Sequence, residues 1–162
     1  MISNSLKFAI YLFASTLLTG IFALATPADD LAQEKKLSAQ YLEKMATETD
    51  AKTIERGIIL RPIFESGSNQ FAKVTDTVKV SYHLVDREGN VVDESITSDA
   101  LAVFPLNKLI QCWQIAIPQI SIGSFYKITC PSDVAYGDKG AADIIKPGAA
   151  LTFRLTVFGI QN

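Results

Sequence analysis

The sequence has few of the side chains on which many active sites depend. Its 162 residues include one histidine and two cysteines. So few ligands cannot build a Cys/His zinc cluster, and a Ser-His-Asp triad would have to use His83. The formal net charge is -2 and no basic stripe is present, so the composition argues against nucleic-acid binding. The length suits one domain with a sizeable core.

Apolar residues are concentrated at the N-terminus. Lys7 precedes an uncharged run from Phe8 to Ala25, which ends in small residues at positions 23 and 25. A positive start, a short apolar stretch and a small-residue end are typical of a secretory signal peptide, so we expect residues 1–25 to be removed before Thr26. The alternative is an uncleaved membrane anchor. A cleaved signal peptide implies that the protein is exported, so we expect it to be periplasmic or secreted.

The next segment has the composition of a helix. From Ala28 to about Arg56 the chain is rich in Ala, Glu, Lys, Gln and Leu, which favour helix. Its apolar residues follow helical spacing only loosely, so we expect a solvated helix with a thin apolar stripe, interrupted near residues 47–53. Residues 26–57 would then form a helical arm or linker. It is either a dimerisation or tethering arm or a spacer without a partner, which leaves the protein a monomer or a dimer through the arm.

Beyond Gly57 the apolar residues repeat with a period of two, which is typical of strands. One buried face of a sheet is predicted by a shared parity of Val74, Val78, Val80, Tyr82 and Leu84. Turn residues at 86–90 and a short helical pattern at 109–117 separate this strand from others near 126–130 and 151–157. Residues 58–162 are therefore expected to form an α+β domain, an antiparallel sheet wrapped around one short helix.

Four segments resemble FKBP-type peptidyl-prolyl cis-trans isomerases, in family order and at family spacing. VKVSYHLVDREGNVVDES resembles the V-x-V-x-Y strand with its turn and Phe-Asp pair, and FPLNKLIQCW resembles F-x-L-x-x-V-I-x-G-W. ISIGSFYKITCPSDVAYG resembles the M-x-x-G strand that leads into an A-Y-G loop, and IIKPGAALTFRLTVFGI resembles the closing I-P-P-x-x-x-L-x-F strand. The arm ahead of the domain is similar to that of the secreted, macrophage-infectivity-potentiator-like group.

The resemblance implies an isomerase that acts on proline-containing polypeptide clients and needs no cofactor. Rotation about an X-Pro bond meets a barrier near ~18–20 kcal/mol because amide resonance is lost in the twisted state. No nucleophile is required, since an apolar pocket that removes water and aims a few donors favours the twisted form. The family also implies macrolide inhibitor binding.

The family's pocket can be carried over residue by residue. Catalytic positions map onto Tyr82, Asp93, Ile110, Trp113, Tyr136 and Phe153, and further substrate-lining positions onto Val92, Phe104, Leu109 and Ile145. The resemblance implies that Trp113 forms the floor beneath the proline ring, with Tyr82 and Phe153 as walls. It also implies that the Tyr136 hydroxyl and the Ile110 N–H donate to substrate carbonyls, while Asp93 orients Tyr82. Taken singly, the aromatic residues are more simply explained as core. Their combination favours the pocket.

The sequence also departs from the family pattern. Val92 and Ala102 stand at positions that are usually or often aromatic, Lys146 replaces a proline, and Cys112 and Ala116 replace glycines. Lost aromatic walls predict reduced or altered catalysis and weakened macrolide binding. The alternative function is a binding module or chaperone with the isomerase fold and weakened or lost catalysis.

The cysteines and the histidine allow further expectations. Cys112 lies at the start of the expected short helix, and Cys130 shares the parity of the expected buried face. In an exported protein these two residues form either a disulfide or two buried free thiols, and the sequence does not separate the two. His83 has the opposite parity from Tyr82, so we expect an exposed sheet histidine and no metal site.

Overall fold

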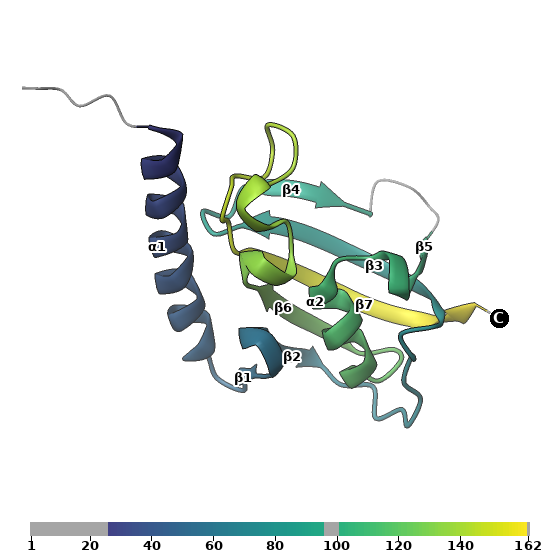
Figure 1. Cartoon of the computed structure of the whole chain (residues 1–162). Helices are drawn as coiled ribbons and strands as arrows, with labels where there is room; N and C mark the ends of the chain where they lie inside the picture. Colours follow the sequence, from purple (N-terminus) through teal and green to yellow (C-terminus); the bar gives the residue numbers. More distant parts are fainter. Residues whose placement is uncertain (1–25, 96–100, 162) are drawn as a thin grey trace, which may run out of the picture.

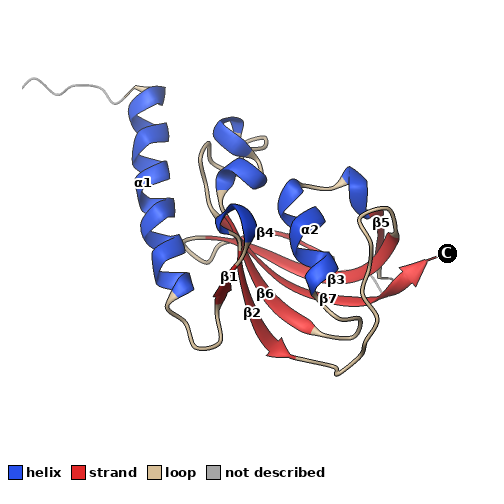
Figure 2. Ribbon diagram, turned by 60° about the horizontal axis from the view of Figure 1, so that its bottom comes forward, coloured by secondary structure: helices blue, strands red, loops and turns tan. Residues whose placement is uncertain are grey.

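The computed structural model describes residues 26–95 and 101–161. A seven-stranded antiparallel sheet forms its centre, with the order β1-β2-β6-β7-β3-β4 and with β5 paired to β3. The short helix α2 lies across one face of this sheet, and the longer α1 stands beside it (Figures 1 and 2). The strands are β1 (Lys52–Thr53), β2 (Ile59–Phe64), β3 (Thr77–Asp86), β4 (Val91–Glu94), β5 (Ala102–Pro105), β6 (Phe125–Cys130) and β7 (Leu151–Gln161). The helices are α1 (Pro27–Ala46) and α2 (Gln111–Ala116), with 3₁₀ turns η1 (Glu55–Gly57), η2 (Leu106–Lys108), η3 (Ile117–Gln119), η4 (Ser132–Val134) and η5 (Gly137–Lys139). The expected α+β fold is confirmed.

The core lies between the sheet and α2. Strands β3 and β7 pair along their length, from Thr77 opposite Gln161 to Asp86 opposite Leu151. Their inward residues alternate with outward ones, as the period of two predicted, and fill the space below α2. The prediction for Val74 was wrong. It lies before β3 in a turn closed by an Asp76 N–H to Lys73 carbonyl bond, and it is 41% exposed.

Helix α1 is shorter than the composition suggested. It begins with a capping box between Thr26 and Asp29 and ends at Ala46. The expected interruption near residues 47–53 is confirmed, because the helix ends there, but the expectation that α-helix continues beyond it to Arg56 was wrong. Lys52–Thr53 instead pair with β2 as a short edge strand, because the threonines and aspartate after Ala46 are poor helix formers.

One face of α1 packs on the rest of the chain. It consists of residues spaced three or four apart, Leu31, Glu34, Ser38, Tyr41 and Met45, of which Glu34, Ser38 and Met45 are buried. Two of these three buried residues are polar, whereas a thin apolar stripe was expected. None of the helices in the described ranges has both the length and the apolar composition to cross a bilayer.

A disulfide joins Cys112 at the start of α2 to Cys130 at the end of β6. Their Cα atoms are 5.9 Å apart. Of the two states that the sequence left open, the structure has the bonded one. The cross-link ties the helix next to Trp113 directly to the sheet.

Candidate functional site

A cleft of about 100 Å³ opens between α2 and the sheet. Its lining combines four strands of the sheet, β3, β4, β5 and β7, with the helix α2, the segment that leads into it and the loop after β6. The lining residues are Tyr82, Leu84, Asp93, Phe104, Leu109, Ile110, Trp113, Tyr136 and Phe153. This volume is below that of a pocket for a drug-sized ligand, so it suits one small ring.

Three aromatic rings form the inner part of the cleft. The Trp113 ring lies edge-on to Tyr82, with centroids 5.4 Å apart, and edge-on to Phe153, with centroids 5.3 Å apart. Trp113 and Phe153 are buried, and such T-shaped pairs hold one another in place. Within the described residues, the indole Nε1–H of Trp113 has no acceptor. The cleft therefore has a rigid apolar wall.

The cleft also contains polar groups, the hydroxyls of Tyr82 and Tyr136 and the carboxylate of Asp93. The Tyr82 hydroxyl donates to Asp93 Oδ2 at 2.7 Å. Burial raises the pKa of Tyr82, and its bond to the Asp93 carboxylate raises that pKa further. Burial and the charge of Asp93 also raise the pKa of Tyr136. Both phenols therefore remain protonated and able to donate hydrogen bonds near neutral pH.

A bulge in β4 places Asp93 on the cleft side. Leu84 pairs with Asp93, whereas the next residue, Val85, pairs with Val91, so Val92 is an extra residue between the two pairs. Asp93 therefore shares the inner face with Leu84, while Glu94 lies opposite His83. No pattern in the sequence predicts this bulge.

The segment before α2 is fixed by its own hydrogen bonds. The Leu109 carbonyl accepts from Gln114 Nε2 at 2.7 Å, and the Ile110 carbonyl accepts from the Trp113 N–H at 3.0 Å. The Ile110 N–H donates to no described residue. A backbone donor is thus present beside the apolar wall, and its bond to a substrate carbonyl stays a prediction.

The structure brings eight of the ten predicted pocket residues into the cleft, together with Leu84, which was not predicted. The parity shared by Tyr82 and Leu84 was the signal that could have identified Leu84. Val92 and Ile145 do not line the cleft. They line a small neighbouring cavity with Glu34 and Arg87, because Val92 is the bulge residue and Ile145 is packed in the core. The functional roles of all ten residues remain predictions.

His83 lies on the outer face of the sheet, away from the cleft. It is half-buried rather than fully exposed, and its Nδ1 is 3.0 Å from Glu94 Oε2. In the described part of the chain, no three His, Cys, Asp or Glu residues are grouped so that they could hold a metal ion.

The family model for FKBP-type peptidyl-prolyl cis-trans isomerases matches residues 68–158. The chain is 29% identical over 125 residues to the peptidyl-prolyl cis-trans isomerase Mip of Coxiella burnetii, covering 77% of this chain and 54% of that protein. It is 31% identical over 133 residues to FkpA of Aeromonas hydrophila, covering 82% and 49%. The crystal structure of FkpA from Escherichia coli superposes with a TM-score of 0.78 at 27% identity, covering 83% of this chain and 62% of that one. The chain spans about half the length of the two curated relatives.

Proposed function

Because this chain belongs to the FKBP-type peptidyl-prolyl cis-trans isomerase family, we propose that it catalyses cis/trans exchange at X-Pro bonds of polypeptide clients. The observation that carries the proposal is the cleft, which is lined by the Trp113, Tyr82 and Phe153 rings and contains the Tyr82–Asp93 hydrogen bond. The cleft has the size of one ring, apolar walls and protonated donors. These are the features that rotation about an amide requires.

The proposed mechanism needs no covalent step. A prolyl ring between the aromatic walls takes the preceding amide out of water, which disfavours the planar form because its larger dipole is better solvated than that of the twisted form. Tyr136 and the Ile110 N–H would donate to carbonyls on either side of the proline and hold the chain while the bond turns. Asp93 would keep the Tyr82 ring in position through its 2.7 Å bond.

Exchange spectroscopy on a short X-Pro peptide tests the proposal. Catalytic amounts of the protein should broaden the separate cis and trans proline signals. Asp93→Asn should lower kcat/KM by about tenfold, because the Tyr82 hydroxyl loses its charged acceptor. Asp30→Asn is the matched control, since Asp30 is exposed on α1, and it should change nothing. A folded wild-type protein that leaves the exchange rate unchanged would refute the proposal.

A binding module is the second candidate function. It is favoured by Val92, which stands where the family usually has an aromatic residue and which lines the neighbouring cavity instead of the cleft. In this case the protein would bind proline-containing chains without accelerating exchange. Peptide titration followed by chemical shifts, run on the same samples, separates binding from catalysis.

The small cleft also supports weak macrolide binding, which calorimetry with a macrolide inhibitor tests.

We further propose that the protein is exported, that residues 1–25 are a signal peptide and that 26–57 form the arm of a 58–162 domain. The signal peptide prediction lies outside the described residues. Its support is the uncharged run in the sequence and the helix cap at Thr26. N-terminal sequencing of exported protein should give Thr26.

Because α1 packs one face on its own chain, we propose a monomer, which light scattering coupled to size exclusion tests.

A further inference from the structure

Helix α1 carries a buried carboxylate that holds an arginine from a distant turn. Glu34 is 7% exposed, and its two oxygens accept from Nε and Nη2 of Arg87 at 2.8 and 3.0 Å. A two-pronged bond of this kind fixes orientation as well as distance. Loss of one partner of a buried ion pair is costly, because it leaves the other charge buried and unpaired. The pair therefore locates α1 against the turn.

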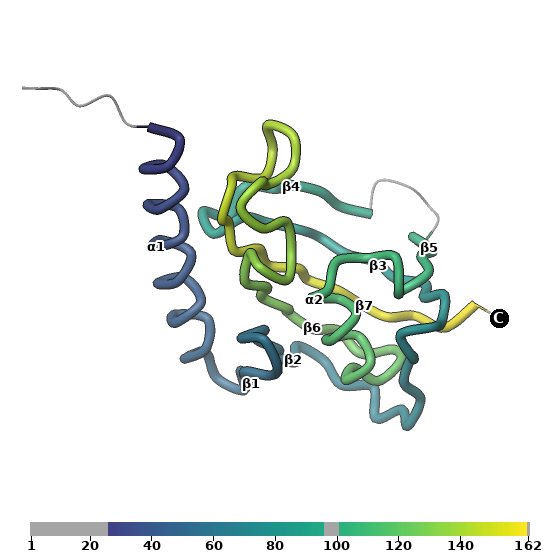
Figure 3. Tube along the Cα trace, viewed as in Figure 1, coloured from purple at the N-terminus to yellow at the C-terminus, as the bar shows by residue number. Residues whose placement is uncertain are grey.

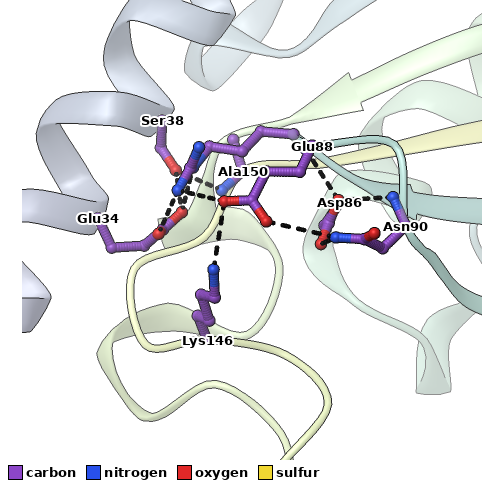
Figure 4. Close-up of polar contacts among 8 residues, drawn as sticks. Glu34, Ser38, Asp86, Glu88, Asn90, Lys146 and Ala150 are labelled. Atoms are coloured by element: carbon purple, nitrogen blue, oxygen red, sulfur yellow. Dashed lines mark hydrogen bonds and ion pairs between the residues drawn. The ribbon is translucent and has the colours of Figure 1, made fainter.

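Arg87 belongs to the tight turn between β3 and β4. Figure 4 shows how Asp86 holds this turn, accepting from the N–H groups of Glu88 and Asn90 at 2.8 and 2.9 Å. The turn is therefore stiff. It leads within three residues to Asp93, so a shift of the turn would be passed to the carboxylate in the cleft.

The same helix face holds the loop that follows Tyr136. Ser38 Oγ accepts from the buried Ala150 N–H at 2.8 Å (Figure 4). Gly148 approaches α1 so closely that a Cβ there would lie 2.9 Å from Lys35 Cγ and 3.0 Å from Leu31 Cδ1. The Gly148 N–H in turn donates to the Gly137 carbonyl at 2.9 Å. Gly148 therefore connects α1 to Gly137, the residue that follows Tyr136.

The turn and the loop also meet each other. Lys146 of the loop lies 3.3 Å from Glu88 of the turn, and one small cavity is lined both by the ion pair and by Val92 and Ile145. Figure 3 shows the loop, in yellow-green, between α1 and β4. The ion pair thus lies next to Val92, which directly precedes Asp93 of the cleft.

We propose that Glu34 is a positioning residue for the cleft. By holding Arg87 it fixes the turn before Asp93 relative to the loop after Tyr136, so that Asp93 and the Tyr136 hydroxyl face one bound peptide at a constant separation. This inference rests on the proposed isomerase function. Glu34 itself does not line the cleft, so it acts only through its partners.

A pair of matched substitutions tests the proposal. Glu34→Gln keeps the shape of the side chain and removes the charge that Arg87 needs. Glu48→Gln is the control. Glu48 follows the same helix and is also partly buried, but it holds Lys127 at 2.7 Å and Arg61 at 3.4 Å, which belong to β6 and β2 rather than to the turn or the loop.

Glu34→Gln should lower kcat/KM for an X-Pro peptide by about three- to tenfold, mainly through kcat, since misplaced groups slow the bond rotation more than they weaken binding. Glu48→Gln should stay within about twofold of wild type, because it leaves the cleft geometry unchanged. Amide shifts of Asp93 and Tyr136 should move in the first variant and not in the second. These shifts report placement, which a loss of stability alone would not change.

Equal activity and equal shifts in the two variants would overturn the inference while leaving the isomerase function intact. A wild-type protein without activity would refute the function, and the amide shifts would still decide the placement. If Glu34→Gln does not fold, Glu34→Asp, which keeps the charge but shortens the reach, is measured instead. It should show a smaller loss of kcat and the same two shifted amides, and an unchanged kcat and unchanged amides would overturn the inference.

Discussion

The two helices are attached to the sheet by different chemistry. Helix α2 buries Cys112, Trp113 and Ala116 in the apolar core and is cross-linked to β6. Helix α1 buries two polar residues, Glu34 and Ser38, and one apolar residue, Met45. The first attachment is apolar and covalent, whereas the second consists largely of directed polar contacts.

This difference separates the parts of the cleft. The aromatic wall, to which α2 contributes Trp113, is held by forces that change little with pH or salt. The turn before Asp93 and the loop after Tyr136 are held by α1, through hydrogen bonds that tolerate only one register and through charges that respond to the solvent. We therefore expect the position of the aromatic wall to be insensitive to pH and salt, and the positions of Asp93 and Tyr136 to depend on both.

Removing the cross-link should have the largest effect on stability. The bond spans 18 residues, and its loss through Cys112→Ala with Cys130→Ala should lower the free energy of unfolding by about 3 kcal/mol. Urea unfolding of oxidised wild type and of the double variant measures this. The contacts of α1 should persist in the folded variant, with unchanged amide shifts at Ala150. An unchanged unfolding midpoint would show that α2 is held by packing alone.

Ser38→Ala should have the next largest effect, about 1–3 kcal/mol, because it leaves the buried Ala150 N–H without an acceptor. Tyr41→Phe is the comparison on the same face. Its hydroxyl meets Thr152 Oγ1 at 2.8 Å, and Thr152 keeps Thr129 as a partner, so about 0.5–1.5 kcal/mol is expected. Urea midpoints rank the two. If Tyr41→Phe were the more costly, the contact of Tyr41 with Thr152 would hold α1 more strongly than the bond of Ser38 to Ala150.

The sheet and the cleft were largely accessible from the sequence, for physical reasons. Strand residues alternate between two faces, so Val78, Val80 and Leu84 reveal the buried side directly. The resemblance supplied the remaining cleft residues, including Asp93, which alternation could not place because the bulge at Val92 shifts the register. A bulge depends on the partner strand and leaves no pattern in its own.

The attachment of α1 was not accessible. The sequence predicts that Glu34 and Ser38 are exposed, because glutamate and serine normally lie at the surface. They are buried because of partners 53 and 112 residues away, Arg87 and Ala150. Local spacing contains no information on contacts of that range. The same holds for Lys52–Thr53, whose strand exists only through pairing with β2.

Acid should loosen α1 before α2. The bond from Arg87 holds the pKa of Glu34 below its ordinary value of 4.5. A carboxyl with a lowered folded pKa stabilises the fold above its unfolded pKa and loses that contribution as the pH falls through the folded pKa. The stability advantage of wild type over Glu34→Gln should therefore be full near neutral pH and shrink below pH 4.5. Paired urea curves at neutral and acidic pH measure this, and a constant difference would contradict it.

The smallest effects are expected at two exposed ion pairs with matched surroundings. Asp138 pairs with Lys35 of α1 at 2.7 Å, and Asp133 pairs with Arg56 at 2.9 Å; both carboxylates are more than half exposed. Asp138→Asn and Asp133→Asn should each change stability by less than about 0.5 kcal/mol, and high salt should abolish the change. Urea midpoints at low and high salt measure both. If Asp138→Asn cost about 1 kcal/mol more than its counterpart, surface charge would share the attachment of α1, and the buried contacts of Glu34 and Ser38 would not suffice to hold it.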